Sequence, residues 1–185
     1  DVFEPGSTYK AFTISGALEE GVITPQDTFF CDGGEQVEDY YLNCHAHEYG
    51  GHGTLDLSGA LEKSCNDALM QIAAKEGVEM FDKYQILFGF GQSTNVDLPG
   101  EPGDSSLSTL VYHASNMHAV ELATSSFGQG VTTSMMQVAT AFSSAINGGY
   151  YYEPSVVQRI EDDNGNIVEN RNPVLVRRTI SEDVS

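Results

Sequence analysis

Apolar residues at helical spacing recur along the first 149 residues of this 185-residue chain, and this pattern most constrains its fold. The pattern occurs in residues 8–20, in two stretches on either side of residues 64–66, in residues 78–88 and in residues 133–146. Apolar side chains three and four positions apart lie on one face of a helix. We therefore predict a mostly helical body. Its last helix is expected to bury the stripe formed by Met136, Val138, Ala139, Phe142 and Ile146.

The remaining sequence favours short strands and loops. A hairpin is expected around residues 31–44, and residues 102–118 read as a polar loop. The Asn-Gly pair at positions 164 and 165 stands between apolar stretches, which is a hairpin signal. We predict a single α+β domain over the whole chain, mainly helical over residues 1–149, with the hairpin and the start of a C-terminal part in residues 150–185.

Charge excludes one class of partner. The chain has 27 Asp and Glu against eight Lys and Arg, a net charge of −19. Nucleic-acid binding needs a basic footprint, so no nucleic acid is expected. The chain shows no signal peptide and no run of about 18 apolar residues that could span a membrane. Because it begins without Met, shortly before the motif described next, we expect a fragment of a longer protein.

Ser7 and Lys10 form the first motif that can carry chemistry. Residues three positions apart on a helix lie on one face, about one turn apart. This spacing can place an amine beside a hydroxyl, and a desolvated lysine with a lowered pKa can take the serine proton. The Ser7 backbone N–H, at a helix N-terminus, could also help hold an oxyanion. The structural alternative makes Ser7 a helix cap and leaves Lys10 in solvent.

Ser64 and Asn66 form the second motif, on either side of Cys65. They lie between two helical stretches, where a short loop could point their side chains into a cleft. A second hydroxyl can relay a proton to a leaving amine, and an Asn carboxamide can both donate to and accept from a substrate amide. The structural alternative is again a helix cap, and Cys65 is interpreted as a small packing residue.

The two motifs in this order resemble the S-x-x-K and S-x-N motifs of active-site serine penicillin-recognising enzymes. Their flanks resemble class B penicillin-binding proteins, the monofunctional D,D-transpeptidases. The similar segments are residues 3–10 (F-E-P-G-S-T-Y-K), residues 51–66, residues 88–101 with G-F-G and D-L-P-G-E, and residues 126–149 with S-F-G-Q-G. The similarity runs from residue 3 to about residue 170. It implies the fold shared by penicillin-binding transpeptidases and serine β-lactamases.

The resemblance implies a role for each matching residue. Ser7 is expected to be the acylated nucleophile and Lys10 its general base. Ser64 is expected to relay the proton, and Asn66 to bind the amide backbone of the substrate.

A second part of the resemblance concerns the cleft around these residues. Phe127 and Gln129 are expected to line it near the acylated serine. The family's third motif, K-[ST]-G, begins at none of the lysines, and the family places its strand beyond the point where this chain stops. We therefore expect an incomplete fold that lacks one wall and the second oxyanion-hole N–H. Losing one oxyanion donor typically costs about 10²–10³ in rate, so the isolated chain is expected to be weak or inactive.

The resemblance also implies a reaction, a location and partners. Ser7 would attack the D-Ala-D-Ala bond of a peptidoglycan stem peptide, release D-Ala, and pass the acyl group to an amine of a neighbouring stem. β-Lactams would acylate the same serine, and no metal or organic cofactor is expected. An N-terminal helix would anchor the longer protein at the extracytoplasmic face of the bacterial cytoplasmic membrane, among proteins of the divisome or elongation complex. A serine β-lactamase or β-lactam sensor domain and a non-catalytic structural module stay open as alternatives.

Cysteine and histidine residues raise the separate question of a metal site. The residues concerned are Cys31, Cys44, His45, His47 and His52. Their spacing fits no standard zinc-ligand template. A disulfide or a close thiol pair between Cys31 and Cys44, across the predicted hairpin, is therefore favoured over zinc.

Overall fold

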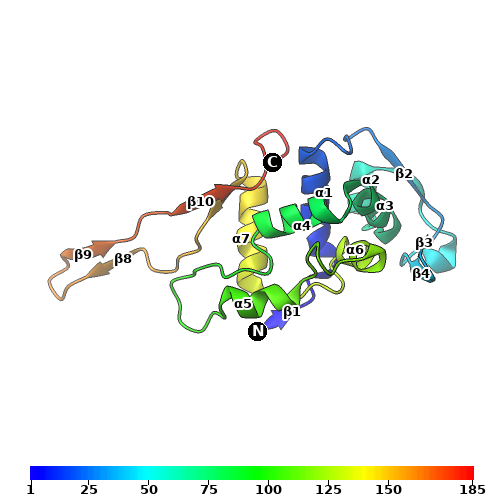
Figure 1. Cartoon of the computed structure of the whole chain (residues 1–185). Helices are drawn as coiled ribbons and strands as arrows, with labels where there is room; N and C mark the ends of the chain where they lie inside the picture. The colour runs from blue at the N-terminus through cyan, green and yellow to red at the C-terminus, as the bar shows by residue number, and fades with distance from the viewer.

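The computed structural model describes all 185 residues, with a helical body from which a two-stranded arm projects (Figure 1). The helices are α1 (Lys10–Glu19), α2 (Leu57–Glu62), α3 (Asn66–Glu76), α4 (Val78–Leu87), α5 (Asp104–Leu107), α6 (Ala119–Ser125) and α7 (Met135–Ile146). Three short 3₁₀ turns accompany them: η1 (Gly6–Tyr9), η2 (His47–Tyr49) and η3 (Ser108–Leu110). None of the helices has the length and hydropathy that crossing a membrane requires.

Ten short strands pair into five antiparallel two-stranded ladders. The pairs are β1 (Val2–Phe3) with β6 (Thr133–Ser134), β2 (Thr28–Cys31) with β5 (Gly53–Asp56), β3 (Gly34–Val37) with β4 (Tyr40–Asn43), β7 (Tyr150–Tyr152) with β10 (Leu175–Arg178), and β8 (Arg159–Glu161) with β9 (Ile167–Asn170). The hairpins predicted around residues 31–44 and around Asn164 and Gly165 are β3–β4 and β8–β9. The β2–β5 pairing sets Cys31 opposite Gly53 and so brings together the ends of the segment that contains β3, β4 and η2.

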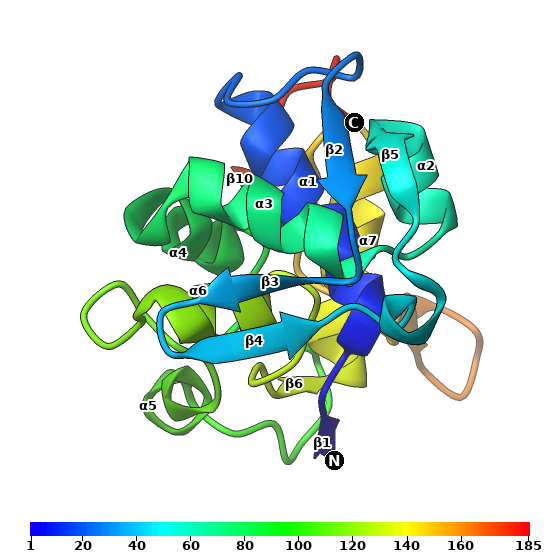
Figure 2. The ribbon, with the colours of Figure 1, turned by 90° about the vertical axis from the view of Figure 1, so that its right-hand side faces the viewer.

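Helix α1 lies in the middle of the body, with α7 on one side of it and α3 on the other (Figures 1 and 2). The ring centroid of Phe12 lies 5.0 Å from that of Phe88 and 4.9 Å from that of Phe90, within an aromatic cluster. Ile14 belongs to a second buried cluster, shared with α3 and β2. Burying one such side chain contributes about 1.5–3 kcal/mol. This packing fixes α1, and with it the turn that carries Ser7.

Close packing of α1 on α4 depends on a glycine. A Cβ at Gly16 would lie 2.8 Å from the ring of Tyr84, so any larger residue would push the two helices apart. At the end of α1, Gly21 adopts φ +68° and donates its N–H to the Leu18 carbonyl, as expected of a C-terminal glycine cap.

Helix α7 forms where the sequence predicts it, but the prediction of its buried face is wrong in part. Ile146 is 78 % exposed, and Ala139 is also exposed. The buried side chains are instead Gln137, Thr140, Ala141, Ser144 and Ala145. Gln137 is buried because it closes a capping box with Ser134 and donates to the Gln92 carbonyl at 2.8 Å. Small residues on the rest of this face allow the helix to approach its neighbours closely.

The segment predicted as a polar loop, residues 102–118, also differs, because it contains α5 and η3. Helix α6, which follows it, has no counterpart among the predicted helices. Its start is fixed by local hydrogen bonding: the Glu121 carboxylate accepts the His118 N–H at 3.0 Å. Apolar periodicity over seven residues is too short to reveal such a helix.

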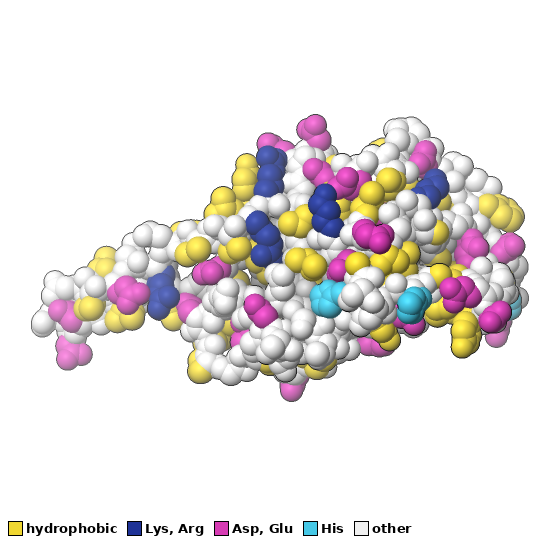
Figure 3. Space-filling view, in the orientation of Figure 1, with side chains coloured by type: hydrophobic (Ala, Val, Ile, Leu, Met, Phe, Trp, Pro, Cys, Tyr) yellow, Lys and Arg dark blue, Asp and Glu magenta, His cyan; other side chains and the backbone are white.

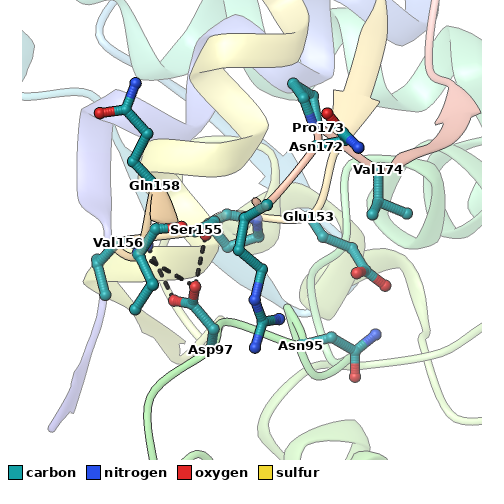
Figure 4. Close-up of a pocket in the computed structure, with 12 residues that line it drawn as sticks. Asn95, Asp97, Glu153, Ser155, Val156, Gln158, Asn172, Pro173 and Val174 are labelled. Carbon is teal, nitrogen blue, oxygen red and sulfur yellow. Dashed lines mark hydrogen bonds between the residues drawn. The ribbon is translucent and has the colours of Figure 1, made fainter. Parts of the chain in front are cut away.

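The D-L-P-G-E stretch acts as a structural clamp. The Asp97 carboxylate accepts the Ser155 hydroxyl at 2.5 Å and the Val156 N–H at 2.9 Å (Figure 4). Glu101 accepts the Thr94 N–H at 2.9 Å and its hydroxyl at 2.7 Å. A cavity of about 390 Å³ lies between the Asp97 loop and the base of the arm, and none of the predicted site residues lines it. The clamp therefore holds the arm and the loop together, away from Ser7.

Many of the acidic side chains of the chain lie on its surface. On the face shown in Figure 3, the Lys and Arg side chains stand apart from one another, and acidic side chains lie between them. That face offers no continuous basic stripe of the kind that tracks a phosphate backbone.

Candidate active site

The loop between α2 and α3 holds Ser64 in an unusual backbone conformation. Its φ is +51°, in the left-handed region that costs a non-glycine residue about 1–3 kcal/mol. The Ser64 N–H donates to the Leu61 carbonyl at 2.9 Å, and the Cys65 N–H to the Ala60 carbonyl at 2.8 Å, which fixes the turn. In this conformation both the carbonyl and the hydroxyl of Ser64 face Lys10.

Lys10 is the first residue of α1 and is only 1 % exposed. Its Nζ donates to the Ser64 carbonyl oxygen at 2.6 Å, to Ser64 Oγ at 2.8 Å and to Asn66 Oδ1 at 2.7 Å. Burial lowers the pKa of Lys10 to about 8. A usable fraction of the amine is thus neutral near pH 7–8, the form that can accept a proton.

Ser7 lies in η1, one turn before Lys10, and is exposed. The Ser64 hydroxyl donates a hydrogen bond to Ser7 Oγ at 2.9 Å, whereas Lys10 forms no hydrogen bond with Ser7. The sequence spacing predicted a direct contact between amine and hydroxyl. The structure instead places Ser64 between them, because Nζ is drawn to the three oxygens of residues 64 and 66. Ser7, Ser64 and Lys10 therefore form one hydrogen-bonded chain.

The segment with S-F-G-Q-G lies directly against the turn that carries Ser7. The Gly6 N–H donates to the Gly128 carbonyl at 3.0 Å, and a Cβ at Gly128 would lie 2.1 Å from the Gly6 carbonyl oxygen. Phe127 is 5 % exposed and packs in the core, whereas Gln129 is exposed. The segment is thus beside the site, and the lining of the cleft by Phe127 and Gln129 stays a prediction.

A second cluster lies behind the loop that carries Ser64. The sequence analysis grouped three of its members, Cys31, Cys44 and His52, but did not include Cys65 with them. Cys31 and Cys44, predicted as a close pair or a disulfide, are free thiols, and the structure brings His52 and Cys65 to them. Cys65 is fully buried at the N-cap of α3, as the packing role predicted. The four residues come from separate elements, so no local spacing in the sequence could reveal them.

The chain matches one protein family along its whole length. The profile of the penicillin-binding protein transpeptidase domain matches residues 1–185. Stage V sporulation protein D of Bacillus subtilis is 34 % identical over 185 residues, which cover 99 % of this chain and 28 % of that protein. Peptidoglycan D,D-transpeptidase FtsI of Escherichia coli is 31 % identical over 160 residues, 85 % of this chain and 25 % of that protein.

Solved structures agree with this match. Penicillin-binding protein 2X of Streptococcus thermophilus superimposes on all of this chain and on 26 % of that structure, with a TM-score of 0.85 and 25 % identity. The chain spans about a quarter of the length of these relatives. The predicted α+β transpeptidase fold and the resemblance to class B penicillin-binding proteins are both confirmed. The chain belongs to the penicillin-binding protein transpeptidase domain family.

Proposed function

We propose that the full-length protein carrying these residues is a serine-type peptidoglycan D,D-transpeptidase whose nucleophile is Ser7. The observation that carries this proposal is the hydrogen-bonded chain from the exposed Ser7 hydroxyl through Ser64 to the buried amine of Lys10. A serine hydroxyl is a weak nucleophile until a linked base takes its proton. This geometry supports Lys10 as the base and Ser64 as the path for the proton.

Acylation follows from that path. Ser7 Oγ attacks the carbonyl carbon of the D-Ala-D-Ala bond, and its proton passes through the Ser64 hydroxyl to neutral Lys10. The C–N bond then breaks, and the proton returns through Ser64 to the leaving amine of D-Ala. An amine of a neighbouring stem peptide then attacks the ester carbonyl and gives up a proton to Lys10 through Ser64. The C–O bond to Ser7 breaks as the new amide forms, and the proton returns through Ser64 to Ser7 Oγ. The Ser7 backbone N–H, at the start of the first helical turns, is proposed to donate to the developing oxyanion.

Asn66 is proposed to bind the amide backbone of the substrate. Its Oδ1 already accepts from Lys10 at 2.7 Å, and this fixes the orientation of the carboxamide. The Nδ2 group forms no hydrogen bond within the chain and can donate to a substrate carbonyl. Phe127 and Gln129 are proposed to border the same cleft, on the segment that Gly128 holds against Gly6.

β-Lactams are proposed to acylate Ser7 by the same route, because they present a reactive amide to the same nucleophile. The full-length protein is proposed to act at the extracytoplasmic face of the cytoplasmic membrane. Divisome or elongation-complex proteins are its proposed partners. A β-lactamase would need a carboxylate placed to activate water, and no carboxylate forms a hydrogen bond with Ser7, Lys10, Ser64 or Asn66.

A fluorescent penicillin tests the nucleophile in the full-length protein. Wild-type protein should be labelled, and Ser7→Ala should lose the label. Ser15→Ala is the matched control, since Ser15 lies on α1, directly after the turn that carries Ser7, and its hydroxyl bonds only the Ala11 carbonyl at 2.7 Å. Labelling of Ser7→Ala at the wild-type rate would overturn the assignment. Incubation with a stem-peptide donor and an amine acceptor should give cross-linked product and D-Ala, whereas hydrolysed donor alone would contradict transpeptidation.

A further inference from the structure

One face of the β3–β4 hairpin presents an aromatic ring and two amides to solvent. Gln36 pairs with Tyr41, and Gly34 pairs with Asn43, so these four residues lie on the same face, called here the outer face. The opposite face packs against the core through Leu42. The side chains of Gln36, Tyr41 and Asn43 are all exposed. The two strands lie across the front of the helical body in the view of Figure 2.

Two neighbouring rings at this face are seated against glycine backbone. A Cβ at Gly34 would lie 3.0 Å from Cε1 of Tyr41, and a Cβ at Gly33 would lie 3.1 Å from Nδ1 of His47. A larger residue at either position would press on the ring beside it. The ring centroids of Tyr41 and His47 are 5.7 Å apart. Both rings are therefore held in place before a ligand binds, so binding costs little side-chain entropy.

The polar groups around these rings are free to bind a ligand. The Tyr41 hydroxyl, the Asn43 carboxamide and the His47 ring form no hydrogen bond within the chain. Gln36 Nε2 donates to the Glu38 carbonyl at 2.8 Å, which fixes the amide and leaves its own oxygen able to accept. The outer face thus offers donors and acceptors side by side, next to an exposed ring.

A carbohydrate matches this combination of groups. The C–H face of a sugar ring packs on an aromatic ring, and the hydroxyl and N-acetyl groups at the edge of the sugar need both donors and acceptors. Charge narrows the ligand further. Residues 30–53 contain no Lys or Arg, and their acidic residues are Asp32, Glu35, Glu38, Asp39 and Glu48. An anionic polymer would be repelled here, whereas a neutral glycan would not.

The outer face ends next to the loop of the candidate active site. Asn43 is the last residue of β4. Cys44 follows it directly, and its Sγ lies 4.0 Å from that of Cys65. Cys65 stands between Ser64 and Asn66 in the sequence. A polymer that lies on the outer face therefore passes beside this loop.

We propose that the outer face, with the His47 ring beside it, binds the glycan strand of peptidoglycan, a polymer of N-acetylated amino sugars. Tyr41 stacks on one sugar ring, and Gln36 and Asn43 form hydrogen bonds with its hydroxyl and N-acetyl groups. A glycan held here keeps its attached stem peptides close to Ser7. The choice of peptidoglycan rests on the proposed transpeptidase function, whereas the sugar-binding chemistry rests on the hairpin alone.

Titration of the full chain with peptide-free oligosaccharides of N-acetylglucosamine, followed by NMR, tests the proposal. The aromatic resonances of Tyr41 and the amide resonances of residues 33–47 should shift, and the shifts give the affinity. Tyr41→Ala should weaken binding about tenfold, because it removes the stacking ring. Tyr41→Phe keeps the ring and should bind within about threefold of wild type. Tyr40→Ala is the matched control and should bind as wild type, since Tyr40 is 62 % exposed on the opposite face of the same strand.

The wild-type titration keeps the test decisive if Tyr41→Ala fails to fold. Unshifted resonances of residues 33–47 at millimolar sugar would overturn the proposal, as would wild-type affinity in a folded Tyr41→Ala variant. Displacement of the sugar by a polyglycerol phosphate would contradict the charge argument and overturn it too. Broadening of these resonances with protein concentration alone, without sugar, would assign the face to a second copy of the chain instead.

Penicillin labelling of Ser7 in the full-length protein, measured separately, distinguishes this proposal from the proposed function. Labelled protein whose hairpin binds no oligosaccharide would refute the glycan site and leave the nucleophile standing. Oligosaccharide binding by a protein that takes no label would support the glycan site and refute the nucleophile.

Discussion

Two polar clusters lie on opposite sides of one short loop, and the fold builds them in different ways. The cluster of Ser7, Ser64, Lys10 and Asn66 uses two local motifs, each within four residues of sequence, and opens to solvent at Ser7. The cluster of Cys31, Cys44, His52 and Cys65 draws one residue from each of four elements and is largely buried. Local motifs can be recognised in a sequence, whereas a site assembled from separate elements appears only when the chain is folded.

The comparison predicts that, among these variants, loss of the Lys10 amine slows acylation the most. Lys10→Met keeps the length of the side chain and removes the base, so penicillin acylation should slow by about 10³-fold or more. Stopped-flow or gel-based labelling of the full-length protein measures the rate. Lys63→Met is the matched control, because Lys63 lies next to Ser64 with an exposed side chain and pairs only with Glu62. A Lys10→Met rate within tenfold of wild type would mean that the amine is not the base.

Variants in the two clusters should differ in their effect on acylation. Ser64→Ala breaks the link between Ser7 and Lys10, so acylation should fall about 10²-fold or more. His52→Gln alters only the cluster of cysteines behind the loop, so it should cause a smaller, several-fold loss of acylation. Acylation rates of the two variants, measured under the same conditions, test this. Equal losses in both variants would show that the clusters act as one unit.

The acylation rate should depend on pH through Lys10. Because burial lowers its pKa to about 8, the neutral amine that accepts the proton increases as the pH rises toward that value. The rate should therefore rise about tenfold per unit well below pH 8 and level off above it. A rate profile between pH 6 and pH 9.5 measures the midpoint. A rate that falls over this range would imply that the protonated lysine is the active form.

A buried carboxyl outside both clusters should have the smallest effect on acylation, because it acts on stability alone. Glu76 is 7 % exposed, both of its oxygens lack a hydrogen-bond partner, and burial raises its pKa to about 9. Between pH 4.5 and pH 9 the folded state holds a proton that the unfolded state has lost, so stability falls as the pH rises, by at most about 1.4 kcal/mol per unit. Glu76→Gln should flatten this slope in urea titrations. An unchanged slope would show that another group causes it.

The sequence predicted the helices in which apolar residues recur over many positions, and the hairpins whose turn residues are characteristic. The body around α1 and the β8–β9 turn at Asn164 and Gly165 are examples. It missed α6, because seven residues carry too little periodicity. It misjudged α7, because the burial of Gln137 depends on a tertiary partner, the Gln92 carbonyl.

The candidate active site could likewise be predicted only in part. Residue types and spacing were enough to select Ser7, Lys10, Ser64 and Asn66. The order of the hydrogen bonds was not predictable, because it depends on the left-handed conformation of Ser64, a non-glycine residue. The cysteine cluster depends on the β2–β5 pairing, which sets Cys31 opposite Gly53, next to His52. That pairing joins strands separated by a glycine-rich segment, and no periodic pattern in the sequence indicates it.

Mass spectrometry of the acyl-enzyme tests the central claim most directly. The full-length protein is treated with a penicillin, and its mass and peptide map are recorded alongside those of Ser7→Ala. We predict one added penicillin on the peptide that contains Ser7, and no addition to the variant. An adduct on another residue, such as Ser64 or Cys65, or an equal adduct on Ser7→Ala, would contradict the account.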